Sequence, residues 1–189
     1  MEKTLDKGDQ QYCAFLRGIN VGGHMLIKME ELRKAFESLG YKNIKTVLAS
    51  GNVIFESREK DIVALSKNIA SRLREISGCS EIVVIVRSLG ELKELESRQP
   101  FKAIVSIPNA RPFVTFLSET SGSRGKSSLP AGDGFQVLSV SGGVICSVLY
   151  DSPVAKTPEL MSFIEKEYGR NVTTRTWSTI ARVLKAADI

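Results

Sequence analysis

Apolar residues in the first half of the chain follow two spacings, one typical of strands and one typical of helices. Short apolar runs predict four strands, at residues 12–16, 45–49, 53–55 and 82–86. Recurrence every three or four residues predicts helices at 29–39, ending at Gly40, and at 62–76, ending near Gly78. The order βαββαβ is the pattern of a ferredoxin-like unit, a four-stranded sheet with two helices on one face.

A second series of elements begins at residue 88. Ser88 and Glu91 form a capping-box pattern, which predicts the start of a short helix. Residues 118–133 are rich in Ser and Gly and predict a loop. The other predicted elements are strands at 113–117, 135–140, 144–150 and 172–175, a helix that begins at Thr157 and a last helix that begins near Trp177.

These elements predict an α+β protein of two ferredoxin-like subdomains packed together, the first at 11–87 and the second, α+β (ferredoxin-like), at 88–189. The strand at 82–86 is apolar at every position, so both of its faces should be buried. We therefore expect the second subdomain to cover the open face of the first sheet.

The stretch between the first strand and the first helix, residues 17–24, holds three glycines and an Asn. Glycine lets a ligand or another backbone approach closely, and backbone N–H groups at a helix N-terminus can hold a phosphate. Arg17 and Lys28 would add positive charge, whereas Glu30 and Glu31 in the first helical turn would compete with a bound anion. The glycine-rich loop fits neither dinucleotide-binding nor P-loop patterns, and its alternative role is a structural turn that docks the two subdomains.

Three stretches of the chain resemble the signatures of the domain-of-unknown-function 1697 family. They are LRGINVGG at 16–23, SGNVIF at 50–55 and TTRTWST at 173–179. The resemblance implies two ferredoxin-like subdomains packed together, in agreement with the predicted elements, and it implies no activity. The chain departs from the family pattern at Thr176 and Ser178, where the family often has Asn.

We expect these three stretches to meet at one crevice that binds a small anionic molecule, such as a nucleotide or a phosphorylated metabolite. Asn20, Asn52 and Thr174 would supply hydrogen bonds there, and Arg17 and Arg175 would supply charge. The candidate ligand-binding residues are Arg17, Gly18, Asn20, Gly22, Gly23, Ser50, Asn52, Thr174 and Arg175.

The net charge of +5 suits an acidic partner and leaves two further function classes open. The first is binding of RNA or DNA through a diffuse basic surface, because RNA-recognition domains share the βαββαβ order and stack bases on aromatic residues. Phe15 and Phe55 are the candidate aromatics, but a buried sheet face would leave no room for bases. This alternative therefore depends on a basic surface with Arg17, Arg175 and Arg182, although the basic residues form no continuous run. The second is an enzyme with its site in the same crevice, for which the sequence nominates no nucleophile or acid–base pair.

The cysteines and the single histidine indicate no metal or cofactor. Cys13, Cys79 and Cys146 are far apart and have no metal-ligand spacing with His24, which is typical of a reduced, cytoplasmic chain. The longest aliphatic run, 82–86, is too short to cross a membrane, and the polar N-terminus lacks the apolar stretch of a signal peptide. The sequence predicts no oligomeric state.

Overall fold

The computed structural model divides the chain into two units. The first contains Met1–Lys93 together with Arg182–Ile189, and the second contains Glu94–Ala181. The residues that the structure describes are 8–19, 27–104, 106–118, 131–132, 134–150 and 157–188.

The C-terminal residues therefore group with the first unit, whereas the sequence placed all of 88–189 in the second. Two long-range contacts join these C-terminal residues to the rest of the first unit. The Lys45 ammonium donates to the Ala186 carbonyl at 3.0 Å, and Lys93 forms an ion pair with Asp188 at 2.8 Å. Nothing in the local pattern of the last helix signals these contacts.

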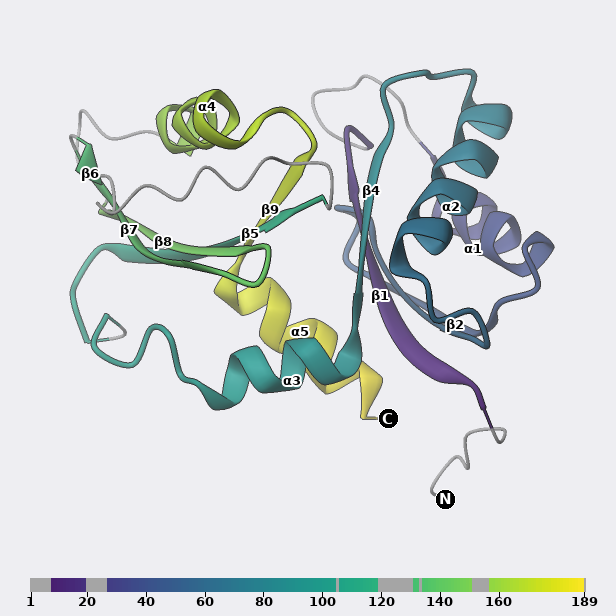
Figure 1. Ribbon diagram of the computed structural model, residues 1–189, viewed down its shortest axis with the longest axis horizontal. Coiled ribbons are helices and arrows are strands. Elements are labelled where there is room, and N and C mark those ends of the chain that lie inside the picture. The colour runs from purple at the N-terminus through teal and green to yellow at the C-terminus, as the bar shows by residue number, and fades with distance from the viewer. Residues whose placement is uncertain are drawn as a thin grey trace. The chain divides into compact units, whose positions relative to one another are not determined.

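The first unit has the ferredoxin-like order predicted from its sequence. Its sheet is antiparallel throughout, in the order β2-β3-β1-β4, and α1 and α2 cover one face (Figure 1). The elements are β1 (Gln10–Arg17), α1 (Met29–Ser38), β2 (Lys42–Val47), β3 (Asn52–Ser57), α2 (Ile62–Ser77) and β4 (Val83–Ser88).

The helix-covered face carries the main apolar core of this unit. Leu32 and Phe36 of α1 and Leu65, Ile69 and Leu73 of α2 are fully buried there. They pack against the alternate sheet residues Tyr12, Ala14, Leu16, Val53, Phe55, Val84 and Val86.

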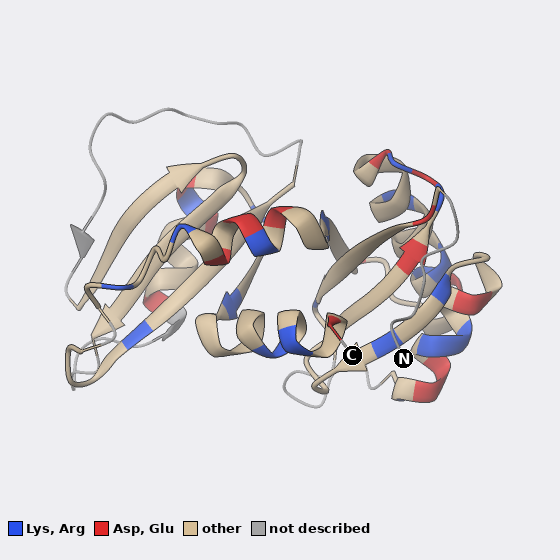
Figure 2. Ribbon diagram, turned by 90° about the horizontal axis from the view of Figure 1, so that it is seen from below, with Lys and Arg blue, Asp and Glu red and all other residues tan. Residues whose placement is uncertain are grey.

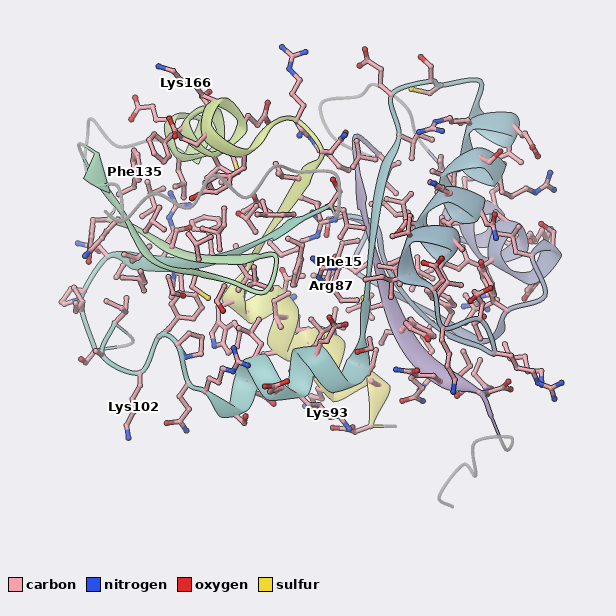
Figure 3. The ribbon with its side chains drawn as sticks, in the orientation of Figure 1. Phe15, Arg87, Lys93, Lys102, Phe135 and Lys166 are labelled. Atoms are coloured by element: carbon pink, nitrogen blue, oxygen red, sulfur yellow. The ribbon has the colours of Figure 1, made fainter. Side chains whose placement is uncertain are left out.

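Both faces of β4 are buried, as its unbroken apolar pattern predicts. Val84 and Val86 belong to the helix-side core, while Ile85 and Arg87 on the other face are 3% and 5% exposed. Phe15 of β1 is also fully buried, and Figure 3 labels it with Arg87 on this sheet. The predicted burial of 82–86 on both faces is therefore confirmed.

The second unit contains a five-stranded sheet in the order β6-β7-β8-β5-β9, again with antiparallel neighbours. Residues 118–133 were predicted to be a loop, but Ala131 and Gly132 pair with Gln136 and Phe135 as a two-residue strand that is too short to leave a sequence pattern. The elements are β5 (Ala110–Leu117), β6 (Ala131–Gly132), β7 (Phe135–Ser141), β8 (Val144–Tyr150), α4 (Thr157–Tyr168) and β9 (Val172–Thr176).

Helix α4 contributes to the core of this second sheet. Leu160 and Ile164 of α4 are fully buried and belong to one cluster with Val137, Ile145 and Leu149. Two further helices, α3 (Leu89–Ser97) and α5 (Trp177–Ala187), contain the points at which the two units divide. The protein is thus α+β, with antiparallel sheets and helices in both units.

Candidate functional site

The end of β1 lies beside the turn that joins β2 to β3. The Leu16 amide donates to the Gly51 carbonyl at 2.8 Å, and Phe15 lies opposite Asn52 across the strand pair. Arg17 and Gly18 follow directly on β1, and Ser50 precedes Gly51 in the turn. The structure therefore brings the first two signature stretches together at one end of the first sheet.

Asn52 holds this turn in shape. It is fully buried, and its amide nitrogen donates to the Val47 carbonyl at 2.8 Å and to the Ser50 hydroxyl at 3.1 Å. The side-chain amide of Asn52 thus stabilises the turn through two hydrogen bonds. Ser50 is exposed and Arg17 is half-buried, so these two residues offer the accessible polar groups at this edge.

Gly51 shows how tightly the turn packs against the segment after β1. A Cβ atom at this position would lie 2.7 Å from Ile19 Cδ1 and 2.9 Å from Leu16 Cβ. Real side-chain atoms essentially never approach that closely, so the contact requires glycine. The sequence indicated the glycine as a turn residue but not the contact with Ile19.

The start of α1 is occupied by a carboxylate of its own helix. Glu31 Oε2 accepts from the Lys28 amide at 3.2 Å, and Glu30 pairs with Lys34 at 2.8 Å. The predicted competition with a bound anion at this helix N-terminus therefore has a structural basis. Asn20, Gly22, Gly23 and His24 lie outside the described residues.

Thr174 and Arg175 belong to β9 in the second unit. The Thr174 hydroxyl lies 2.7 Å from the Thr115 hydroxyl, and Arg175 Nη1 donates to the Thr173 hydroxyl and the Thr174 carbonyl, both at 2.9 Å. Thr176 Oγ1 accepts from the Thr179 amide at 3.3 Å and so caps α5. These residues have local roles within their unit, and their meeting with Arg17 at one crevice stays a prediction.

The aromatic candidates for base stacking are not accessible. Phe55 is fully buried in the helix-side core and Phe15 is fully buried as well, so neither ring offers a surface on which a base could stack, and binding of nucleic acid through basic residues stays a prediction. Lys and Arg are distributed over several elements and are interspersed with Asp and Glu (Figure 2), so the described residues show a diffuse charge distribution.

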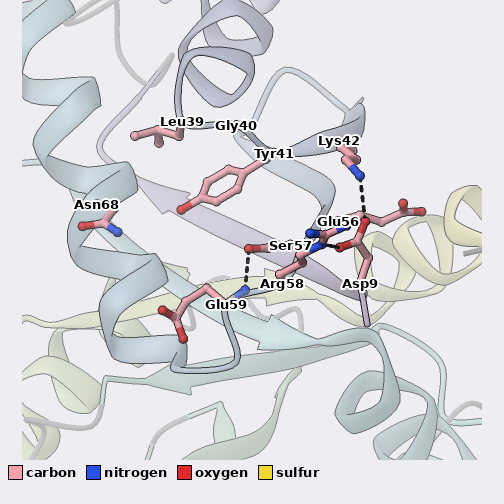
Figure 4. Close-up of a pocket in the computed structure, with 10 residues that line it drawn as sticks. All are labelled: Asp9, Leu39, Gly40, Tyr41, Lys42, Glu56, Ser57, Arg58, Glu59 and Asn68. Atoms are coloured by element: carbon pink, nitrogen blue, oxygen red, sulfur yellow. Dashed lines mark hydrogen bonds and ion pairs between the residues drawn. The ribbon is translucent and has the colours of Figure 1, made fainter. Parts of the chain in front are cut away.

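A cavity of about 450 Å³ lies at the other end of the first unit, where β1 begins and β3 ends. Figure 4 shows Tyr41 at its centre, Asn68 of α2 on one side and the charged residues Asp9, Arg58 and Glu59 around it. No sequence pattern predicts this site, because its residues come from separate segments and form no motif. The available signal was a mixed charged stretch, 56–61, which begins in the last two residues of β3.

Asp9 organises one wall of the cavity. Its side chain is only 2% exposed, and its two oxygens accept from Lys42 Nζ at 3.1 Å and from Arg58 Nε at 3.2 Å. Two cations therefore share one buried carboxylate, and the guanidinium and ammonium groups remain largely exposed.

The opposite wall of the cavity carries the Tyr41 ring and hydroxyl, the Asn68 amide and Glu59. Burial raises the pKa of the Tyr41 hydroxyl, the negative charge of Glu59 raises it further, and a hydrogen bond from Asn68 acts in the opposite direction. The Tyr12 hydroxyl donates to the Glu59 carbonyl at 3.0 Å, and burial followed by the charge of Glu59 raises its pKa too. Both hydroxyls stay protonated at neutral pH.

The cysteines are thiols in this structure and form no disulfide. Burial raises the pKa of the Cys146 thiol, which disfavours the reactive thiolate. Within the described ranges no cluster of His, Cys, Asp and Glu side chains is arranged to hold a metal ion. No helix in the described part of the chain is long and apolar enough to span a membrane.

Comparison with known proteins gives a family and a fold. The model of the family described as "Protein of unknown function (DUF1697)" matches residues 10–144. A conserved bacterial protein from Streptococcus pneumoniae has a similar structure, with a TM-score of 0.65 and 19% sequence identity over 94% of this chain and 98% of that one. The comparison with curated proteins gave no match.

Proposed function

The chain belongs to the DUF1697 family, whose description assigns no function, and on that premise we propose that it binds a small anionic molecule beside Arg17. The ligand class is a nucleotide or a phosphorylated metabolite. The observation that carries the proposal is the junction of β1 with the β2–β3 turn, where Leu16 donates to Gly51 and two signature stretches adjoin.

Two accessible groups at this junction suit an anion. Arg17 supplies a guanidinium, which recognises carboxylate and phosphate oxygens through paired N–H donors, and Ser50 supplies an exposed hydroxyl. Asn52 holds the turn that presents Ser50, so its contribution is to position the site. Thr174 and Arg175 of the second unit complete the proposed ligand set.

The reduced cysteines support a second, coarser proposal, that the protein works in a reducing compartment such as the cytoplasm. Cys13 and Cys146 are buried thiols, and Cys79 is partly accessible without forming a disulfide.

A thermal-shift experiment on the full chain tests the ligand proposal. The probes are adenosine diphosphate, inorganic pyrophosphate and a short single-stranded RNA, each at about 50 mM and about 200 mM salt. A ligand at about a hundred times its dissociation constant adds roughly 2.7 kcal/mol of stability. For a chain of this size, that corresponds to a rise in midpoint of about 5–10 °C.

Arginine variants give the test its specificity. We expect the rise to survive the higher salt and to be lost in Arg17→Gln, while Arg33→Gln on the exposed surface of α1 keeps it. Arg175→Gln shows whether the second unit contributes. No rise with any probe, or an equal rise in Arg17→Gln, would contradict the proposal, and a rise with RNA alone that collapses with salt would favour nucleic acid.

A further inference from the structure

The cavity beside Tyr41 carries opposite charges on its two sides. Arg58 and Glu59 are neighbours in sequence, but their side chains diverge (Figure 4). Arg58 turns toward Asp9 and Lys42, whereas the Glu59 carboxylate lies on the side of Asn68 and the Tyr41 hydroxyl. A molecule that spans the cavity therefore meets positive charge at one end and negative charge at the other.

The positive end is formed by Lys42 and Arg58, which share the Asp9 carboxylate. Glu56 also lines this end, where it is buried and accepts hydrogen bonds from Gln11 and Asn43. Arg58 uses its Nε for this ion pair, and its side chain is 74% exposed. The outer edge of the guanidinium is thus placed to take a second carboxylate from solution.

The negative end is formed by Glu59. One of its carboxylate oxygens accepts from the Asp61 amide at 2.8 Å, which holds the side chain in place. The negative charge of Glu59 contributes to raising the pKa of the hydroxyls of both Tyr12 and Tyr41. An ammonium group beside Glu59 would find a carboxylate, and the Asn68 amide lies close by on the same side.

Tyr41 forms a fixed aromatic wall between the two ends. Its ring packs against Phe55 with a centroid distance of 4.7 Å, and Phe55 in turn meets Phe36 at 5.4 Å. Leu39 adds an aliphatic surface to the lining. The volume of about 450 Å³ falls within the range of small-molecule sites, roughly 300–1,000 Å³.

We propose that this cavity binds a small zwitterion, with its ammonium at Glu59, its carboxylate at Arg58 and its apolar body on Tyr41. Free amino acids and short peptides share this chemistry. The site is separate from the anion site proposed at Arg17 and adds a second ligand class to the protein.

Nuclear magnetic resonance titration of the isotope-labelled full chain tests the proposal. The probes are L-phenylalanine and the dipeptide glycyl-phenylalanine, which distinguish a free amino acid from a peptide. Each is compared with its N-acetyl derivative, which lacks the ammonium, and its C-terminal amide, which lacks the carboxylate. We expect saturable shifts of the Tyr41 and Asn68 signals with at least one probe, and about tenfold weaker binding of both blocked forms.

Charge-removing variants that keep side-chain size complete the test. We expect Glu59→Gln and Arg58→Gln each to weaken binding about tenfold. Lys60→Gln, an exposed neighbour outside the cavity lining, should leave binding unchanged. The proposal is wrong if no probe saturates, if the blocked forms bind equally well, or if Lys60→Gln weakens binding as much as the other two. It is also wrong if inorganic phosphate competes fully and Glu59→Gln has no effect, because the cavity is then a simple anion site.

Discussion

The two sheets of this protein share one strand order but differ in the helices that cover them. In the first unit the order is β2-β3-β1-β4, and in the second the strands β7-β8-β5-β9 occupy the same positions, with β6 added outside β7. In each sheet the strand that comes first in the sequence is central. β1 pairs antiparallel with β3 and β4, and β5 pairs antiparallel with β8 and β9. The sheet pairing therefore repeats, although the sequence shows no repeat.

The described cores of the two units differ in the helices that contribute to them. In the first unit α1, which lies between β1 and β2, adds Leu32 and Phe36 to the core beside α2. In the second unit, α4 is the helix whose residues join the described core. The cavity lies in the first unit, where Tyr41 follows α1, Asn68 lies on α2, and Asp9 and Arg58 flank the ends of β1 and β3. Its lining therefore combines helix residues with strand ends.

The largest contrast between the units should come from two turn glycines. Gly51 and Gly142 both have positive φ, +76° and +57°, but a Cβ on Gly51 would meet Ile19 and Leu16 while one on Gly142 would meet nothing within 4 Å. We expect Gly142→Ala to lose about 1 kcal/mol from backbone strain alone. Gly51→Ala should lose about 3 kcal/mol or more, because overpacking adds to the strain.

Urea unfolding followed by circular dichroism measures both losses. Equal losses for the two variants would contradict the close packing of the β2–β3 turn against the end of β1. In that case the junction would not be rigid enough to position Arg17 and Ser50 for a ligand.

A second contrast concerns hydroxyl groups inside the second sheet. Thr115 and Thr174 pair at 2.7 Å, whereas the fully buried Ser147 hydroxyl has no hydrogen-bond partner among the described residues. Removing one member of a pair leaves the other unsatisfied, so Thr115→Val should lose about 1–3 kcal/mol. Ser147→Ala should change stability by less than about 0.5 kcal/mol or increase it, because it removes a polar group that is already unsatisfied.

The double variant Thr115→Val with Thr174→Val serves as the control. It removes both hydroxyls and should recover part of the loss, since no unsatisfied partner remains. Differential scanning calorimetry on the four proteins gives the comparison. A loss in Ser147→Ala as large as that in Thr115→Val would show that Ser147 has a partner of its own.

Local signals in the sequence predicted most of the fold. The capping box at Ser88 and Glu91 is present, with the Ser88 amide donating to Glu91 at 2.7 Å and the Glu91 amide donating to the Ser88 hydroxyl at 3.2 Å. The hairpin at Gly142 and the burial of β4 on both faces also follow from short-range pattern. These features depend on residues within a few positions of one another, which is what a single sequence records.

Features that depend on distant residues escaped the sequence analysis. The cavity combines Asp9, Tyr41, Arg58 and Asn68, which come together only through the register of β1, β2 and β3. Asn43 sits in a bulge of β2 at φ +49° and donates to buried Glu56 at 2.6 Å, another pairing that no local motif marks. The contact of Lys45 with Ala186 spans most of the chain. The candidate site residues at Arg17, Ser50 and Asn52 were found because a family signature, rather than periodicity, marked them.

The smallest expected effect is a difference in alkaline stability between the units. In the first unit the folded protein holds the Tyr41 proton more tightly than the unfolded chain does, because the pKa is raised above its usual 10.0. The free energy of unfolding should therefore carry the full contribution of this group below pH 10 and lose it as the pH rises further.

In the second unit the pKa of Cys146 is raised above its usual value of 9.0, so its contribution to the free energy of unfolding should likewise be lost as the pH rises. Urea midpoints from about pH 8 to about pH 11 should show a shallower alkaline decline for Tyr41→Phe above pH 10, and for Cys146→Ala the change should begin near pH 9. A decline in Tyr41→Phe as steep as that of the unmodified chain would mean that burial and the charge of Glu59 do not raise the Tyr41 pKa in the folded protein.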